Sequence, residues 1–173
     1  MKIRAETPND ISAVRKVNIA AFERENEADL VDRLRGVAST FSFVAEDSSA
    51  EESNRIVGHI FYSPVEIEGD CPNDLFILGL APIAVLPEHQ RHGIGSLLIQ
   101  QSLDECARLG CKAVVVLGYP DYYPKFGFVL ANEKGLRSEY SVPDEAFMIL
   151  ELEKGALEGC RGTVRYRSEF GDV

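Results

Sequence analysis

The spacing of apolar residues predicts a chain that mixes helices and strands. Residues 11–21 and 27–35 carry apolar side chains three or four positions apart, which is typical of helices with one buried face. Thr7-Pro8-Asn9-Asp10 before the first segment has the residue types of a capped helix start, and Gly36 suits a stop. Alternating or continuous apolar runs predict strands over residues 2–4, 41–45, 55–67, 75–85, 113–117, 126–130, 147–152 and 164–166, the last as an edge strand.

A longer helix is predicted over residues 93–109, between the strands 75–85 and 113–117. The order strand, helix, strand forms a crossover, so these two strands run parallel while the remaining ones pair antiparallel. Pro82 lacks an N–H, so we expect a bulge or a local opening of the sheet there. Residues 48–54 and 69–73 are predicted as turns, and residues 119–125 as a short helix or turn. The pattern indicates an α/β fold with a mixed sheet of about seven strands, in one domain over residues 1–173.

Composition narrows the kind of partner. The chain has 173 residues and a formal net charge of −10, from 28 acidic and 18 basic side chains. Nucleic-acid binders and proteins of anionic membrane surfaces usually carry a basic field, so we expect neither partner. No apolar run reaches the ~18 residues of a membrane span, and Met1-Lys2-Ile3-Arg4 lacks the apolar region of a signal peptide. We expect a soluble, cytoplasmic protein.

The cysteines and histidines do not predict a metal site. The four cysteines, Cys71, Cys106, Cys111 and Cys160, form no C-x-x-C pair, and their spacing suggests neither a zinc site nor a disulfide framework. We expect them to be reduced thiols. His89 and His92 are three residues apart without a further cluster of ligand residues, so no metal is expected.

The main chemical signal is Gln90-x-x-Gly93-x-Gly95, at the start of the long helix. Helix N-termini present unpaired N–H groups and a partial positive charge, which suits a phosphate, and glycines let the backbone come close to it. Arg91 adds a cation. A P-loop lysine is absent, and Leu98 stands where a dinucleotide fingerprint needs its third glycine. Taken alone, the pattern also fits a plain tight helix start.

Four motifs together resemble the GNAT superfamily of acyl-CoA-dependent N-acyltransferases, and more narrowly a small bacterial branch of predicted acetyltransferases. The first is the run from Ile83 to Gly95, which contains Pro87 and Gln90 at the family's spacing, and the second is Tyr123 followed by Gly127-Phe128. The branch also carries the patterns seen here in residues 27–35 and 58–65. The order of elements matches the family along nearly the whole chain.

The resemblance implies that acetyl-CoA is the co-substrate and a primary amine the acceptor, either a small molecule or a protein amine. It places the pantetheine arm on the backbone of Ile83, Ala84 and Val85, where two parallel strands splay apart. It assigns the pyrophosphate to the loop Gln90, Arg91, His92, Gly93, Ile94, Gly95 and Ser96. The acceptor stays open, and so does the oligomeric state, with a homodimer through the C-terminal strands as one arrangement.

Amine attack on a thioester forms an oxyanion and releases a thiolate, so the reaction needs a hydrogen-bond donor and an acid. A backbone N–H near Val85 is the candidate donor. Tyr123 is the candidate acid, because a phenol with a pKa of about 10 is protonated at neutral pH. Tyr122 is its substitute, and a purely structural aromatic wedge is the alternative role for Tyr123.

The attacking amine must be neutral, and a lysine-like amine with a pKa of about 10.4 costs about 4.6 kcal/mol to deprotonate at pH 7. Candidate bases are His59, Glu27 and, less favoured, Glu66. His59 fits equally well as a buried strand histidine with satisfied hydrogen bonds, and Glu27 as a helix-start acid. Two other functions stay open: a non-catalytic acyl-CoA-binding domain, and an unrelated nucleotide-binding α/β protein.

Overall fold

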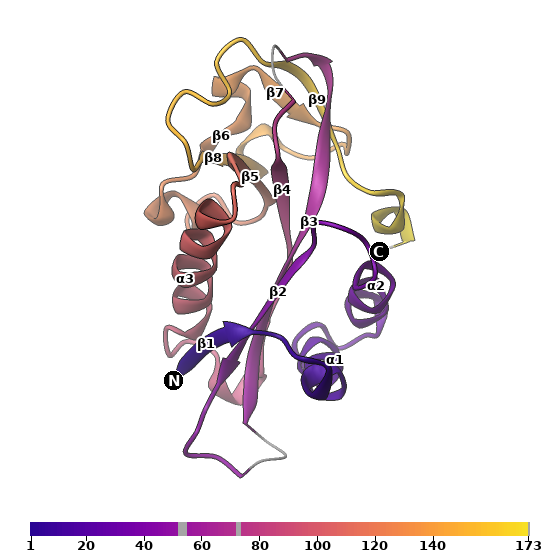
Figure 1. The fold of residues 1–173 in the computed structure, drawn as a ribbon, viewed down its shortest axis with the longest axis vertical. Coiled ribbons are helices and arrows are strands. Elements are labelled where there is room, and N and C mark those ends of the chain that lie inside the picture. The colour runs from indigo at the N-terminus through magenta and orange to yellow at the C-terminus, as the bar shows by residue number, and fades with distance from the viewer. Residues whose placement is uncertain (52–54, 72–73, 173) are drawn as a thin grey trace. The chain divides into compact units, whose positions relative to one another are not determined.

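The structure, a computed structural model, describes residues 1–51, 55–71 and 74–172 (Figure 1). Its α-helices are α1 (Ile11–Phe22), α2 (Asn26–Leu34) and α3 (Ile94–Arg108). The strands in the described ranges are β1 (Lys2–Ala5), β2 (Phe41–Glu46), β3 (Ile56–Asp70), β4 (Ile77–Val85), β5 (Ala113–Leu117), β6 (Val129–Leu130), β7 (Leu136–Ser138), β8 (Phe147–Glu151) and β9 (Arg161–Arg165). The strands hydrogen-bond in the order β1-β2-β3-β4-β5-β8-β6, and β9 pairs with β3 and β7.

The chain divides into two compact units. Unit 1 contains Met1–Tyr62, Ala81–Asp104 and Glu169–Val173, and unit 2 contains Ser63–Leu80 and Glu105–Ser168. Strands β3 and β4 and helix α3 contribute residues to both units. The extent of one domain over residues 1–173 stays a prediction.

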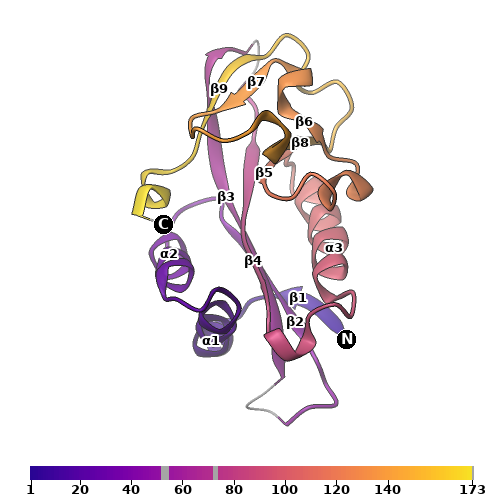
Figure 2. The same ribbon diagram turned by 180° about the vertical axis from the view of Figure 1, so that it is seen from behind.

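Unit 1 is a layered arrangement in which helices cover both faces of β1, β2 and β3. Strand β2 pairs antiparallel with β1 and β3. Figures 1 and 2 show α1 and α2 on one face of these strands and α3 on the other. The two-residue period of β3 explains why both faces are filled, because His59 and Phe61 point to one side and Gly58 and Tyr62 to the other.

Each face of this sheet has its own packing. Toward α1 and α2, the buried apolar residues are Val14, Val17, Leu30, Val31, Leu34, Val44, Ile56, Phe61 and Ala84. Toward α3, Gly58 lets the helix come close, because a Cβ there would lie 3.0 Å from Leu98 Cδ1 and 3.2 Å from Ile94 Cγ2. The start of α3 is therefore packed tightly against β3, which fixes where the helix N-terminus lies in unit 1.

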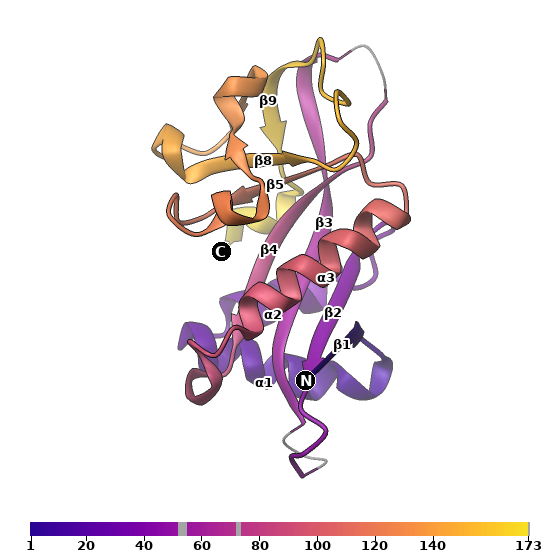
Figure 3. The ribbon, with the colours of Figure 1, turned by 90° about the vertical axis from the view of Figure 1, so that its left-hand side faces the viewer.

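Unit 2 contains the parallel pair and the late strands. Strand β5 pairs in parallel with β4 over Ile77–Gly79 and antiparallel with β8 along its whole length. Figure 3 shows β5 and β8 side by side. Strand β9 lies between β3, with which it is antiparallel, and β7, with which it is parallel. The predicted mixed α/β sheet with a parallel β4/β5 pair is confirmed.

Several predicted boundaries were wrong. The predicted strand over 126–130 is reduced to Val129–Leu130, because Tyr123–Phe126 forms a 3₁₀ helix that ends at Gly127 with a φ of +99°. The strand predicted at the C-terminal edge is flanked on both sides, since β7 was not predicted. The predicted turn over 69–73 is wrong at Gly69 and Asp70, which belong to β3. Residues 72–73, and residues 52–54 of the other predicted turn, lie outside the described residues.

The cysteine prediction was also wrong, because Cys71 and Cys160 form a disulfide. The antiparallel ladder of β3 and β9 ends with Asp70 opposite Arg161, so the next pair in register is Cys71 and Cys160, with Cα atoms 4.1 Å apart. The two residues are 89 positions apart in the sequence, and only the strand pairing brings them together. Cys106 and Cys111 are free and buried, as expected for structural thiols.

Candidate active site

The loop before α3 places the predicted anion-binding residues at a helix N-terminus in unit 1. Helix α3 begins at Ile94, and its first backbone hydrogen bond runs from Leu97 N–H to the Gly93 carbonyl at 3.0 Å. The N–H groups of Ile94 and Gly95 precede that bond and so have no partner within the helix. Gly93 has a φ of +81°, in the left-handed region that favours glycine. The local backbone is therefore arranged as an anion-binding helix start needs.

Side chains add positive charge and rigidity to this loop. Arg91 is exposed and has a φ of +65°, which is rare for a residue with a Cβ. The Gln90 side chain donates from Nε2 to the Val85 carbonyl at 3.0 Å, and His92 Nδ1 lies 3.2 Å from the His89 carbonyl. The glutamine thus ties the loop to the end of β4, while the guanidinium of Arg91 stays at the surface.

Strand β4 carries Ile83, Ala84 and Val85 at its end. Its ladder with β5 covers Ile77 to Gly79 only, in the described residues, although β4 itself continues to Val85. The pairing therefore stops before Pro82, as the predicted opening of the sheet requires, and β4 is continuous through the proline. The Ala81–Pro82 peptide bond is cis.

Tyr123 is the first residue of the 3₁₀ helix Tyr123–Phe126 in unit 2, and it is 6% exposed. Its ring packs edge-on against Tyr122 and Phe128, with centroid distances of 5.2 and 5.6 Å. It also lies directly on Gly118, because a Cβ at Gly118 would be 2.3 Å from Cε2 of the tyrosine ring. Because Gly118, the residue after β5, has no side chain, the phenol ring of Tyr123 can lie against its backbone.

The environment of Tyr123 keeps its hydroxyl protonated. Burial raises the pKa of Tyr123 to about 12, and the neighbouring Tyr122 and Tyr119 add to the rise. Among the described residues, the structure gives this hydroxyl no hydrogen-bond partner. The O–H is thus protonated at neutral pH, and its donor is not used within the described residues.

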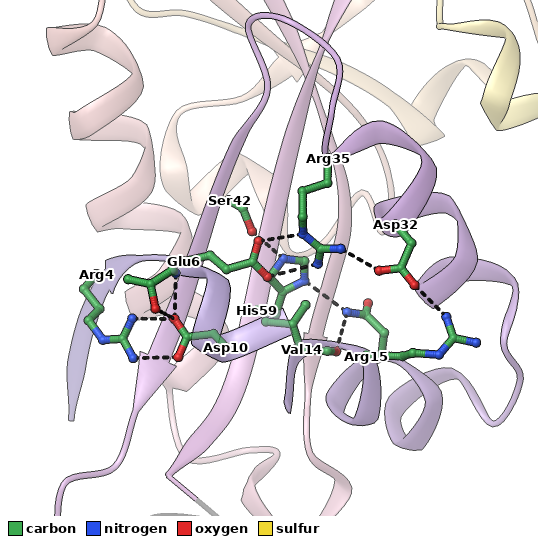
Figure 4. Close-up of polar contacts among 11 residues, drawn as sticks. Arg4, Glu6, Asp10, Val14, Arg15, Asp32, Arg35, Ser42 and His59 are labelled. Atoms are coloured by element: carbon green, nitrogen blue, oxygen red, sulfur yellow. Dashed lines mark hydrogen bonds and ion pairs between the residues drawn. The ribbon is translucent and has the colours of Figure 1, made fainter. Parts of the chain in front are cut away.

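His59 occupies a different kind of environment, on β3 in unit 1, with no exposed surface. Its Nδ1 lies 3.0 Å from Asn18 Nδ2 and its Nε2 lies 2.8 Å from Ser42 Oγ (Figure 4). An amide nitrogen can only donate, so Nδ1 accepts and the ring proton sits on Nε2. Burial, followed by the positive charge of Arg35, lowers the pKa of His59 to about 3.

The catalytic role of His59 therefore stays a prediction that this geometry does not favour. Both ring nitrogens are engaged, and no part of the ring reaches the surface. The arrangement agrees with the other role that the sequence leaves open, a neutral histidine with satisfied hydrogen bonds. Arg35, which lies near the ring, is itself held by both carboxylate oxygens of Glu6 at 3.1 Å (Figure 4).

Two carboxylates complete the predicted set. Glu27 lies in the first turn of α2 in unit 1, where it is 6% exposed and accepts hydrogen bonds from Nε and NH2 of Arg24. The Arg24 side chain is 51% exposed, so the pair lies at the surface of the helix. Glu66 is exposed on β3 in unit 2.

The predicted residues fall into two groups. Unit 1 holds the loop before α3, the end of β4, His59 and Glu27, and unit 2 holds Tyr123 and Glu66. The placement of Tyr123 beside the thioester carbonyl stays a prediction. In the described part of the chain, no three or more His, Cys, Asp or Glu side chains gather as a metal site would need. No helix there has the length and hydropathy of a membrane span.

Sequence reasoning missed the residues that support the predicted ones. Asn18 holds His59 through a hydrogen bond. The sequence feature that could have indicated this is a polar residue four positions after Val14 on an otherwise apolar helix face. Gly118 follows the apolar run of β5, and a glycine at that point indicates a close approach of another group. The partner role of Ser42 had no signal in the sequence, because it depends on the register between β2 and β3.

A mixed sheet whose short parallel pair, β4 and β5, is connected through a helix with unpaired N–H groups at its start defines an α/β protein of a class that can hold a phosphate-bearing molecule. Residues 11–128 match the model of the acetyltransferase (GNAT) family. The N-acetyltransferase YhbS of Escherichia coli K12 is 34% identical over 171 residues, which cover 98% of both chains. The chain belongs to the GNAT acetyltransferase family and is an acyltransferase.

Solved structures of relatives have the same fold. The crystal structure of E. coli YhbS in complex with CoA has a TM-score of 0.89 and 33% identity, and the match covers 98% of this chain and 91% of that one. A GNAT acetyltransferase from Brucella melitensis in complex with acetyl-CoA has a TM-score of 0.77 and 32% identity, over 98% and 97% of the two chains.

Proposed function

We propose that the protein transfers the acetyl group of acetyl-CoA to a primary amine by direct attack through a tetrahedral intermediate. The observation that carries this is the loop before α3, where the N–H groups of Ile94 and Gly95 and the exposed Arg91 can hold a pyrophosphate. The relatives bound to CoA and acetyl-CoA support the same ligand here. The remaining loop residues, Gln90, His92, Gly93 and Ser96, complete the pyrophosphate site.

The end of β4 receives the pantetheine arm in this proposal. Backbone groups of Ile83, Ala84 and Val85 lie beyond the last residue that pairs with β5, so they can pair with the amides of the arm. A backbone N–H near Val85 stabilises the oxyanion, because a fixed donor costs no reorganisation when the charge develops.

Tyr123 acts as the general acid that protonates the departing thiolate. Its pKa of about 12 means that the phenol keeps its proton throughout the physiological range. Turnover therefore shows no alkaline loss from this group below about pH 11, and it rises from acid pH as the acceptor amine loses its proton. The proton of the amine leaves through water toward Glu27, since His59 offers no accessible nitrogen.

The test is a screen of amines with acetyl-CoA, read out as released thiol, on the natural protein and on Tyr123→Phe. We expect Tyr123→Phe to lower kcat by roughly 10²- to 10⁴-fold, the usual contribution of a general acid, and to change the acetyl-CoA Kd by less than about threefold. Tyr119→Phe is the control, because its ring is 79% exposed in the same loop. Tyr122→Phe examines the substitute acid.

Other results would select other functions. Unchanged turnover in Tyr123→Phe removes the acid role and leaves the ring as a structural wedge. Tight CoA binding without turnover of any amine by the natural protein favours an acyl-CoA-binding module. Binding of ATP or NAD in place of CoA favours an unrelated nucleotide-binding protein.

A further inference from the structure

Unit 2 contains a cavity of about 180 Å³ in the segment that joins β7 to β8. A water molecule occupies about 30 Å³ of the liquid, so the space suits a group of amino-acid size rather than an oligosaccharide. Its lining combines apolar side chains with hydroxyl, amide and charged groups: Asn132, Leu136, Arg137, Ser138, Tyr140, Ser141, Val142, Pro143, Asp144 and Phe147.

This cavity is connected to the Tyr123 loop by direct contacts within unit 2. The Tyr123 ring lies on Gly118, and the N–H of Gly118 donates to the Ala146 carbonyl at 2.9 Å. Ala146 stands between the lining residues Asp144 and Phe147, and Phe147 is opposite Leu117 in the β5–β8 ladder. The segment that contains Asp144 is thus hydrogen-bonded to the glycine that the Tyr123 ring contacts, whereas Arg137 belongs to β7.

The two charged lining residues form no ion pair within the described residues, although Arg137 is near enough to Glu68 to contribute to the lowered pKa of that carboxyl. Among the described residues, the structure gives neither Arg137 nor Asp144 an ion pair or side-chain hydrogen bond. Ion pairs with carboxylates hold Arg4, Arg15, Arg24, Arg35, Arg108 and Arg165, whereas the exposed Arg91 and Arg161, like Arg137, form none within the described residues. The apolar lining that remains open to solvent comes from Val142 and Pro143, because Leu136 and Phe147 are only 2% and 3% exposed.

We infer that this cavity holds the body of the acceptor, and that the acceptor is an apolar α-amino acid with a free carboxylate. The carboxylate pairs with Arg137, whose planar guanidinium matches it in a bidentate way, and the carbon side chain lies on Val142 and Pro143. The amine lies beside Asp144, in the segment that the Ala146 carbonyl joins to Gly118. This inference rests on the proposed function and names the acceptor class for it.

The test compares L-leucine, L-methionine and L-phenylalanine with their carboxamides, which keep the side chain and amine but lack the carboxylate. The natural protein is expected to prefer the carboxylates. Arg137→Gln should raise the KM for the carboxylates by roughly ten- to hundredfold and change the KM for the amides and the acetyl-CoA Kd by less than about threefold. Arg161→Gln is the matched control, because Arg161 is an exposed arginine on β9 that lines a different cavity.

Calorimetric titration of the same amino acids and amides, with CoA present, separates this inference from the proposed function. If no amine is acetylated but the carboxylates bind and Arg137→Gln weakens them selectively, the cavity assignment stands and the proposed reaction fails. If turnover occurs with other amines, and the amino acids neither bind nor react, the cavity assignment is overturned. An equal loss for carboxylates and amides in Arg137→Gln overturns it as well.

Discussion

The surroundings of His59 and Tyr123 show two ways in which a buried titratable ring can be held. Both residues are candidates from the sequence, and both are almost completely covered by protein. His59 has a hydrogen-bond partner at each ring nitrogen, and burial lowers its pKa to about 3. Tyr123 is enclosed by aromatic rings and a glycine, and burial raises its pKa to about 12. Each group is thus kept neutral at pH 7.

The difference lies in what remains available to a ligand. His59 donates from Nε2 to Ser42 and accepts at Nδ1 from Asn18, so its ring links β3 to β2 and α1. The tyrosine hydroxyl keeps its donor, since its contacts are made by the ring. Burial and a shifted pKa therefore do not by themselves identify a catalytic group, and the hydrogen bonds that each polar atom already makes must be compared as well.

The largest effect that distinguishes the two regions is the acid sensitivity caused by His59. Its pKa is about 3 in the folded protein against 6.5 in the unfolded chain, so only the unfolded state takes up a proton between these values. This contribution to stability is present above pH 6.5 and is lost as the pH falls toward 3. We expect the free energy of unfolding to fall by about 2 kcal/mol from pH 7 to pH 5, and by about 4 to 5 kcal/mol at pH 3, from this group.

Urea unfolding at several pH values, on the natural protein and on His59→Gln, measures this contribution. His59→Gln should be less stable at pH 7 and should lose the slope between pH 6.5 and about pH 5, above the range in which the carboxylates contribute. Asp10 contributes only at lower pH, because Arg4 lowers its pKa from 3.8 to about 2. An identical slope in both proteins would show that His59 is charged or accessible in the fold, and would return it to the candidate bases.

The fold was predictable from the sequence where local pattern decides. The spacing of apolar residues in α1 and α2, and the continuous apolar run of β5, predicted those elements closely. The prediction failed where the structure depends on contacts between residues far apart in the sequence. Strand β7 has only three residues, and its partner β9 lies more than twenty residues further on, so no local pattern marks it. The Cys71–Cys160 disulfide was missed for the same reason.

The site was predictable where the backbone supplies it. Gly93 and Gly95 predict a helix start that can hold an anion, because glycines mark positions where the backbone needs an unusual conformation or a close approach. The environment of a side chain depends on which elements pack on it, and this is why His59 was left with two open roles. Its burial depends on α1 and β2 together, which one strand's sequence cannot show.

Gly118→Ala is the next largest test, because it moves the Tyr123 ring without changing the phenol. The added Cβ would lie 2.3 Å from Cε2, so the ring must shift. A displacement of about 1 Å at a catalytic group can cost about 10² in rate, so we expect kcat to fall ten- to hundredfold. Steady-state turnover and acetyl-CoA titration measure the effect.

Gly79→Ala is the matched steric control in the same unit. Its Cβ would lie 2.9 Å from Cε1 of Tyr166, a buried tyrosine with no role in the proposed reaction. It should lower the free energy of unfolding as Gly118→Ala does, and leave kcat closer to that of the natural protein. A similar loss of kcat in both variants would mean that turnover reports general destabilisation rather than the position of Tyr123.

The smallest expected effect on ligand binding concerns Gly93, which precedes the N–H groups proposed to hold the pyrophosphate. Gly93 and Gly110 stand at the two ends of α3 with φ values of +81° and +97°, and a Cβ at either would meet nothing within 4 Å. An alanine therefore costs only the strain of a left-handed residue, about 1 to 2 kcal/mol, at both positions. Gly93→Ala should weaken acetyl-CoA binding about tenfold, because the N–H groups that follow it leave their positions, while Gly110→Ala should lose similar stability with an unchanged Kd. Calorimetric titration of both variants decides this, and equal Kd values would place the pyrophosphate away from the start of α3.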